Sequence, residues 1–199
     1  TAARVVVRFL LAFPDSIVAT TAPTDRQVKK ILWQEIRRAR TQATIPIRTS
    51  PLIKEWTIKD GWFAIGLSTD DPDAFQGLHA ASGYVLIVID EASGVPQPIW
   101  DAIDGSLSSE NGRLLTIGNP TNPIGPFADE FKHPHTHKIA ISAFDTPNFT
   151  SFGITLDDIR ADEWQEKIKG PLPYPALVTP HWVREKWETW GENSPMWVA

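Results

Sequence analysis

Short runs of apolar residues recur along the chain between longer segments of helical periodicity. The runs 17–21, 85–89 and 113–117 are mostly apolar and lack the apolar–polar alternation of a strand with one exposed face. Continuous runs of this length are typical of strands buried on both faces of a parallel sheet. A further strand is predicted at 137–143.

Segments of helical period separate these strands and are bounded by turn residues. Pro14 follows the first segment, and Pro23 precedes the second. Asp60 and Gly61 lie between two short apolar stretches, which predicts a β-hairpin made of 53–58 and 62–67. The predicted helices are 1–13, 25–40, 94–107, 157–169 and 180–190.

The alternation of strands and helices predicts a three-layer α/β fold around a mainly parallel sheet. Ligands of such sheets bind at the carboxyl ends of the strands. We therefore expect functional side chains just after Thr21, Ile89 and Ile117.

The composition is that of a globular protein, with 199 residues of which 42% are hydrophobic and 22% charged. Cysteine is absent, which excludes disulfides and thiolate metal sites. No run of about 18 apolar residues occurs, so no membrane partner is expected. The formal net charge is −5, so a DNA partner would have to bind a local basic surface.

Two adjacent carboxylates follow the most apolar strand. Asp90 and Glu91 come directly after 85–89. This is the Walker B arrangement, in which the first carboxylate helps to hold Mg²⁺ on a nucleotide and the second polarises the attacking water. The alternative is a buried strand followed by a solvated acidic turn, because the same pattern also arises by chance.

Small and amide residues follow the strand 113–117. Thr116 and Asn119, with Gly118 between them, carry groups that can hydrogen-bond a γ-phosphate or the attacking water, and so can report hydrolysis to the rest of the fold. The alternative is an ordinary turn, because Gly-Asn-Pro favours one by itself.

Five short segments spread along the chain form an ordered set: 17–26, 62–68, 90–92, 117–121 and 141–148. In their order along the chain they resemble the ATPase domain of bacteriophage large terminases. The resemblance covers most of the chain. It implies a P-loop NTPase-like fold of the additional-strand type, and an ATP-driven motor that packages DNA into a viral prohead.

The same resemblance implies roles for individual residues. Asp90 would be the nucleotide-binding and magnesium-site acid, Glu91 the catalytic base, and Thr116, Gly118 and Asn119 part of the coupling motif. The implied cofactors are ATP and Mg²⁺. The implied partners are double-stranded DNA, the portal, the small terminase subunit and further copies in a homo-oligomeric ring, all in the host cytoplasm.

The resemblance also implies a domain organisation. Residues 1–150 would form the ATPase core, and 151–199 a helical linker toward a nuclease domain outside the chain. The family's glycine-rich loop ending in Gly-Lys-Ser or Gly-Lys-Thr is missing from the sequence. Because helix 1–13 resembles the helix after that loop, we expect the loop to lie upstream of Thr1. We also expect phosphate binding by this chain alone to be weak.

A second departure concerns an arginine that the family often contributes in trans. The comparable stretch here, 75–79, contains no arginine. A trans-acting arginine at this place is therefore not expected.

The missing phosphate-loop strand leads to a prediction about the sheet. In the family that strand lies between the strands that correspond to 113–117 and 137–143. Its absence would leave two inner edges with unpaired backbone groups. We therefore expect either that these two strands pair directly or that another segment fills the gap, as in strand exchange with a neighbouring molecule.

Basic residues form a stripe about 100° wide along the predicted helix 25–40, at about 100° per residue. Arg26, Lys30 and Arg37 are the candidates for contact with DNA phosphates. The periodicity places Trp33 inside this stripe and Ile31 on the opposite, core-facing side. The alternative is a solvated helix face on which Trp33 covers lysine side chains.

A triplet of histidines, His133, His135 and His137, precedes and enters the predicted strand 137–143. Two histidines on one face of a strand would allow a metal pair. A polar strand edge is the simpler interpretation, because no carboxylate lies at ligand spacing.

Two other function classes remain as alternatives. A helicase-type ATPase domain also places Asp-Glu after a buried strand, but Ser93 stands where the helicase sequence Asp-Glu-Ala-Asp requires its second aspartate. A non-catalytic scaffold or binding fragment is the other alternative, because the phosphate loop is absent. Titration with a nucleotide separates this case from the ATPase.

Overall fold

The computed structural model describes residues 2–44, 47–80, 82–194 and 197. The chain forms two compact units. The first consists of Thr1–Pro120 with Ile124–Glu130, and the second of Thr121–Pro123 with Phe131–Ala199. The functional division predicted after residue 150 stays a prediction.

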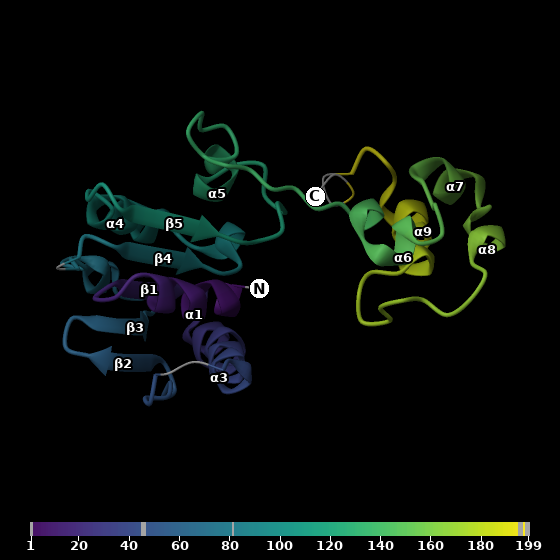
Figure 1. Cartoon of the computed structure of the whole chain (residues 1–199). Coiled ribbons are helices and arrows are strands. Elements are labelled where there is room, and N and C mark those ends of the chain that lie inside the picture. Colours follow the sequence, from purple (N-terminus) through teal and green to yellow (C-terminus); the bar gives the residue numbers. More distant parts are fainter. Residues whose placement is uncertain (1, 45–46, 81, 195–196, 198–199) are drawn as a thin grey trace. The chain divides into compact units, whose positions relative to one another are not determined.

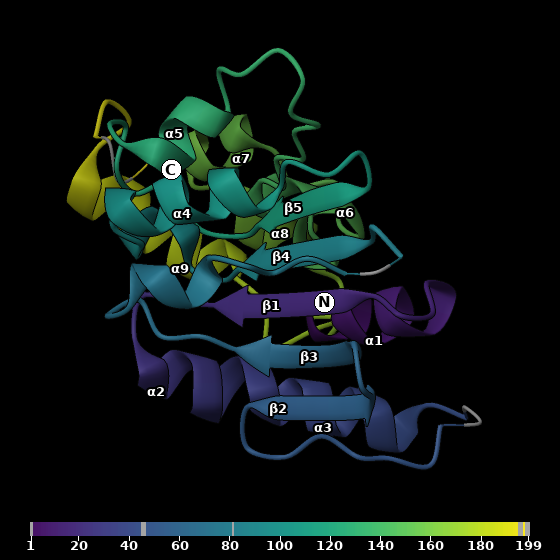
Figure 2. The same ribbon diagram turned by 90° about the vertical axis from the view of Figure 1, so that its left-hand side faces the viewer.

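One five-stranded sheet forms the centre of the first unit, in the order β2-β3-β1-β4-β5 (Figure 1, Figure 2). All neighbouring strands are parallel except β2, which is antiparallel to β3. The predicted α/β class with a mainly parallel sheet is confirmed. The strands are β1 (Ile17–Thr21), β2 (Glu55–Lys59), β3 (Trp62–Gly66), β4 (Val85–Ile89) and β5 (Gly112–Thr116).

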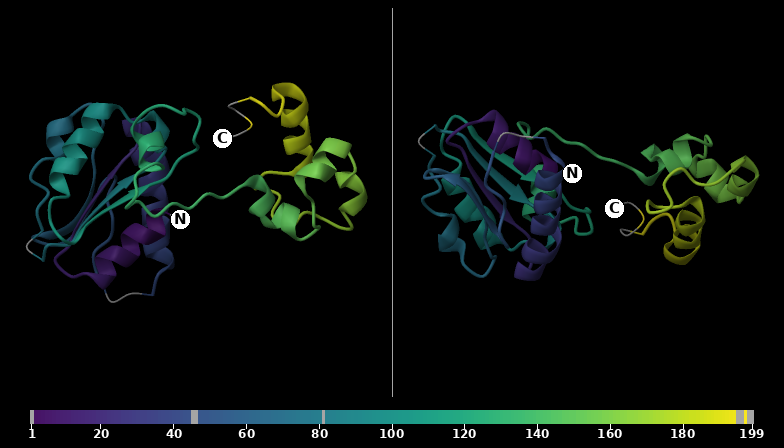
Figure 3. Two further views of the ribbon diagram at one scale, coloured as in Figure 1. Left: turned by 90° about the horizontal axis from the view of Figure 1, so that it is seen from above. Right: turned by 60° about the horizontal axis from the view of Figure 1, so that its bottom comes forward.

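Helices cover both faces of the sheet, which gives three layers (Figure 3). Val18 and Val88 point to the face covered by α1 and α3, and Ile87 points to the face covered by η2 and α4. The alternation along each strand therefore feeds two separate cores. The helices and turns of the unit are α1 (Ala2–Ala12), α2 (Asp25–Gln27), η1 (Val28–Leu32), α3 (Trp33–Gln42), η2 (Pro72–Phe75), η3 (Ala92–Gly94), α4 (Gln97–Ser106) and α5 (Pro126–Glu130).

A π-helical turn, η1, interrupts the helix predicted at 25–40. The Trp33 N–H donates to the Val28 carbonyl, five residues back, instead of four. The wider turn rotates the rest of the helix, because each residue of an α-helix advances by about 100°. The predicted positions of Trp33 and Ile31 are therefore wrong: Trp33 is fully buried, and the Ile31 side chain is 55% exposed.

A hydrogen bond holds the buried Trp33 against the face of the sheet that α1 and α3 cover. Its Nε1–H donates to Thr20 Oγ1 at 2.9 Å. Gly66 leaves the room that the indole needs, since a Cβ at Gly66 would lie 2.5 Å from Trp33 Nε1. The π turn thus lets an aromatic residue reach the end of β1.

The strand predicted at 137–143 is wrong. The backbone there forms no strand, and the side chains of Ile139 and Ile141 are 70% and 76% exposed. Among the described strands β5 pairs with β4 alone, so it is an edge strand. Both expected compensations are therefore also wrong, because neither direct pairing nor a substitute strand closes that edge.

The second unit is helical around a small core of Phe149, Ile159, Trp164 and Val183. The helix predicted at 157–169 is broken where Asp162 adopts a left-handed conformation, with φ of 60°. The helix predicted at 180–190 is confirmed. The elements are η4 (Ala143–Asp145), α6 (Pro147–Thr150), α7 (Leu156–Ala161), α8 (Trp164–Lys167) and α9 (Pro180–Trp190).

None of the described helices is long and apolar enough to span a membrane.

Candidate active site at the carboxyl edge of the sheet

The ends of β1 and β4 are joined where the sheet meets its loops. The Asp90 N–H donates to the Thr21 carbonyl at 2.9 Å, which extends the ladder one residue beyond β4. Thr21 is fully buried, and its Oγ1–H donates to the Leu67 carbonyl at 3.0 Å. Three neighbouring strands therefore fix the backbone from which Asp90 projects.

Asp90 is a half-buried carboxylic acid. Its removal from water raises the pKa of its carboxyl group, and a hydrogen bond from the Glu91 backbone N–H opposes this change. A carboxylate with incomplete hydration favours a cation as its partner.

Glu91 is exposed and has a left-handed backbone, with φ of 52° and ψ of 45°. This conformation costs a residue with a side chain about 1–2 kcal/mol. The η3 turn that follows holds it, because the Gly94 N–H donates to the Glu91 carbonyl at 3.0 Å. Strain of this kind at the end of a strand is a common property of functional sites.

The end of β5 is bound to the same turn through backbone groups. The Ile117 N–H donates to the Ile89 carbonyl, and the Ala92 N–H donates to the Ile117 carbonyl, both at 2.9 Å. The next residue, Gly118, lies very close to the turn, since a Cβ there would be 2.9 Å from the Ala92 nitrogen. The predicted coupling segment and the Asp90–Glu91 pair therefore lie together at one hydrogen-bonded junction.

The three predicted coupling residues occupy different positions at this junction. Gly118 contacts the turn directly. Thr116 lies opposite Ile89 in the register and so shares the side of the sheet that α4 covers. Asn119 is exposed beyond the strand end.

Sequence reasoning missed two contributors to the junction. The Ile117 carbonyl acts through the backbone, and no side-chain type signals that role. Phe127 of α5 is buried, with its ring 3.4 Å from where a Cβ of Gly118 would lie. Its place after a Gly-Pro pair, at the start of a helix, was the available signal.

The carboxylates of the junction are of the kind that a Mg²⁺ ion on a nucleotide requires. Mg²⁺ in nucleotide sites usually takes one or two protein carboxylates and completes its shell with waters and phosphate oxygens. A half-buried Asp90 beside an exposed Glu91 fits that requirement. Within the described ranges no three His, Cys, Asp or Glu side chains form a metal-binding group.

The predicted DNA-binding residues differ in how much of each side chain is available. Arg26 and Lys30 are exposed. Arg37 is half-buried, and its Nη1 donates to the carbonyls of Leu52 and Ile53 at 2.9 and 3.0 Å. Arg37 therefore has a structural role on the loop before β2, whatever else it binds.

The histidine triplet is spread along an exposed connection. The rings of His133 and His135 are 5.7 Å apart, and all three histidines are exposed. No strand forms here, so the expected strand edge is absent.

The chain is similar to a protein of Enterobacteria phage P7 named "Probable terminase, large subunit". The two are 29% identical over 147 residues, which cover 69% of this chain and 28% of the phage protein. No family model and no solved structure matches the chain. The resemblance to terminase large subunits is thus confirmed, and the chain spans little more than a quarter of that relative's length.

Proposed function

We propose that this chain provides the acidic part of a Mg-ATP hydrolysis site in a DNA-packaging motor of the terminase type. The junction at the carboxyl edge is the observation that carries the proposal. A half-buried Asp90, a strained Glu91 and the end of β5 are held together there by backbone hydrogen bonds. The similarity to a phage terminase large subunit supports the same function.

Each residue has a distinct task in this proposal. Asp90 holds Mg²⁺, which when bound neutralises charge on the phosphate oxygens. Glu91 orients the attacking water and accepts its proton at a carboxylate oxygen. Because the Ala92 N–H is bonded to the Ile117 carbonyl, a shift of the Glu91 turn is transmitted directly to Gly118 and Asn119. Coupling to movement of DNA would begin at this bond.

Nucleotide titration tests the proposal. The glycine-rich phosphate loop is not in the sequence, so calorimetry with Mg-ATP should give a dissociation constant no better than about 1 mM, or about −4 kcal/mol. In a longer chain that carries such a loop ahead of Thr1, Glu91→Gln should abolish phosphate release and preserve ATP binding. Unchanged turnover would remove Glu91 from the role of base.

DNA binding is the second part of the proposal, with the portal, the small subunit and a ring of copies as further partners. Arg26 and Lys30 carry it best because both are exposed. Arg26→Gln with Lys30→Gln should reduce the salt dependence of DNA binding by about one unit of slope per lost phosphate contact. Arg38→Gln is the matched control, since exposed Arg38 is already paired with Glu35. Equal slopes for both variants would exclude the stripe.

A further inference from the structure

The turn that follows Glu91 has a second neighbour, which comes from the segment after β1. A Cβ at Gly94, in η3, would lie 2.8 Å from Pro23 Cγ and 3.3 Å from Pro23 Cβ. The proline ring therefore lies against the backbone of the turn, and glycine leaves the room that the ring needs. The Gly94 N–H donates to the Glu91 carbonyl at 3.0 Å. The residue that contacts Pro23 is thus hydrogen-bonded to Glu91.

Pro23 is itself held by the loop that follows β3. The Thr69 hydroxyl donates to the Pro23 carbonyl at 3.0 Å. This loop is fixed to the end of β1, because the Leu67 N–H donates to the Thr20 carbonyl at 2.8 Å and the Leu67 carbonyl accepts from the Thr21 hydroxyl at 3.0 Å. The closed ring of a proline cannot swing away from its own backbone. Its displacement therefore requires a shift of the backbone that Thr69 holds.

Two close contacts thus enclose the turn, one from each side. On the side of β5, a Cβ at Gly118 would lie 2.9 Å from the Ala92 nitrogen, and on the side of β1 the Pro23 ring lies against Gly94. The left-handed backbone of Glu91 is unfavourable for a residue with a side chain. Such a conformation persists only where the surrounding structure determines it. The contacts from both sides supply that surrounding structure.

We propose that Pro23 and Thr69 are positioning residues that hold Glu91 in its left-handed conformation. The φ and ψ angles of Glu91 set the direction in which its side chain leaves the end of β4. Loss of the Pro23 contact would therefore turn the carboxylate away from the attacking water. The consequence for hydrolysis rests on the proposed function of Glu91, whereas the contact and the conformation do not.

NMR spectroscopy of the 199-residue chain tests the positioning. Thr69→Val removes the hydroxyl and keeps nearly the same shape. Exchange of the Gly94 amide with water should become about three- to tenfold faster, as expected for the loss of one hydrogen bond. The Glu91 Cα and Cβ chemical shifts should move away from left-handed values. Thr69→Ser retains the hydroxyl and should behave like the wild type.

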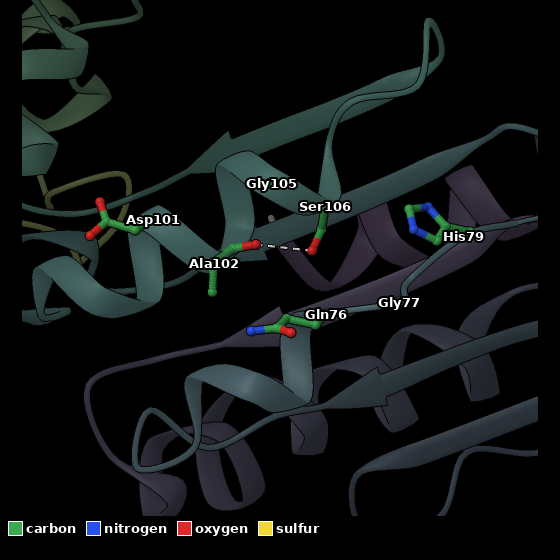
Figure 4. A pocket seen from close by; sticks show the side chains of 7 residues that line it. All are labelled: Gln76, Gly77, His79, Asp101, Ala102, Gly105 and Ser106. Atoms are coloured by element: carbon green, nitrogen blue, oxygen red, sulfur yellow. Dashed lines mark hydrogen bonds between the residues drawn. The ribbon is translucent and has the colours of Figure 1, made fainter.

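A second hydroxyl of the first unit provides the matched control. Ser106 is buried in the wall of a cavity none of whose lining residues belongs to the Glu91 turn, and its hydroxyl donates to the Ala102 carbonyl at 2.9 Å (Figure 4). Ser106→Ala should lower the stability of the unit and leave the Glu91 and Gly94 signals unchanged. The comparison separates a positioning role from a general loss of stability.

A pair of small substitutions provides the decisive measurement. Gly94→Ala adds a methyl group that collides with Pro23 Cγ, and Pro23→Ala removes that Cγ. Each change alone should alter the Glu91 chemical shifts. The double variant should lie closer to the wild type than either single variant, because the new methyl group occupies the space that Cγ leaves. Such non-additivity is the property of residues in direct contact.

Steady-state kinetics test the consequence for hydrolysis in a longer chain that carries the phosphate loop. Thr69→Val and Gly94→Ala should each lower kcat by about ten- to a hundredfold, the usual effect of a misplaced catalytic group. KM for Mg-ATP should stay near the wild-type value, because Glu91 acts only when water attacks. Thr69→Ser should restore kcat.

The proposal is wrong if Thr69→Val and Gly94→Ala leave the Glu91 shifts and Gly94 exchange at wild-type values, or if the effects of Pro23→Ala and Gly94→Ala simply add. Unchanged kcat in variants whose Glu91 shifts have moved would also overturn it. A longer wild-type chain without any hydrolysis would overturn the proposed function alone, because the NMR measurements still decide the positioning.

Discussion

Replacing Gly118 by alanine would test the junction between β5 and the Glu91 turn. The new Cβ would lie 2.9 Å from the Ala92 nitrogen and 3.4 Å from both the Ser93 nitrogen and the Phe127 ring. Because two of these atoms belong to the backbone, the turn itself must move. Overpacking of this kind costs about 1–3 kcal/mol. Alanine also restricts the unfolded chain, which returns about 0.4–1 kcal/mol.

The net expectation for Gly118→Ala is a loss of about 1–2 kcal/mol of stability in the first unit. Gly105→Ala is the matched control, because no atom lies within 4 Å of its Cβ position in α4. That change should stabilise the helix by about 0.5–1 kcal/mol. The two substitutions add the same methyl group, so opposite signs would isolate the effect of the close approach.

Hydrogen exchange followed by mass spectrometry is the suitable assay, because the chain has two compact units and a single unfolding transition is not assured. Peptides that cover β4 and β5 should exchange faster in Gly118→Ala and no faster in Gly105→Ala. Protection of both strands equal to the wild type in Gly118→Ala would refute a tight junction. It would also remove the physical basis for coupling through the Ile117 carbonyl.

Three further predictions concern single side chains. Asp90→Asn should stabilise the first unit at neutral pH, because burial raises the pKa of this carboxyl and so disfavours its charged form. The gain in stability should shrink as pH falls, because the wild-type carboxyl then becomes protonated. Equal urea midpoints for the variant and the wild type at pH 7 would contradict this prediction. Trp33→Phe removes the 2.9 Å hydrogen bond from Trp33 Nε1–H to Thr20 Oγ1. It should lower the free energy of unfolding, measured in urea, by about 1 kcal/mol. The pKa of Asp158 is lowered to about 2, first by its hydrogen bond to Lys167, so its contribution is complete above about pH 4 and disappears toward pH 2. Asp158→Asn should flatten that acid limb in a circular-dichroism titration of the second unit.

The centre of the first unit could be predicted from sequence because strands β1 and β4 are buried on both faces. Val85–Ile89 has no polar residue, and only a central strand of a covered sheet needs that composition. The error at Trp33 has a different origin, since periodicity assumes a uniform turn and cannot detect the π turn at Val28–Leu32. The error at 137–143 arises because a strand forms only when a neighbouring strand pairs with its backbone. The sequence pattern of a single segment cannot show whether such a neighbour exists.

The candidate site was predictable in its side chains but not in its backbone. Asp90 and Glu91 stood out because two carboxylates followed a buried strand. Gly118 stood out only as part of a turn, and the reason for glycine there is the approach of the Ala92 nitrogen, which depends on a residue 26 positions earlier. The left-handed backbone of Glu91 had no signal, because glutamate is not a residue type that favours it.

The edge strand β5 has a consequence for how this sheet can grow. Connections between parallel strands are right-handed in nearly all proteins. From β1 through α3 the chain moves toward β3, and from β4 through α4 on the opposite face it moves toward β5. A parallel strand joined to β1 through α1, on the same face as α3, must therefore come from the side of β4 and β5. Since β4 is already paired on both sides, such a strand has one place to join, beside β5. Its carboxyl end would then lie beside the carboxyl end of β5, so the connection into α1 would pass next to Gly118.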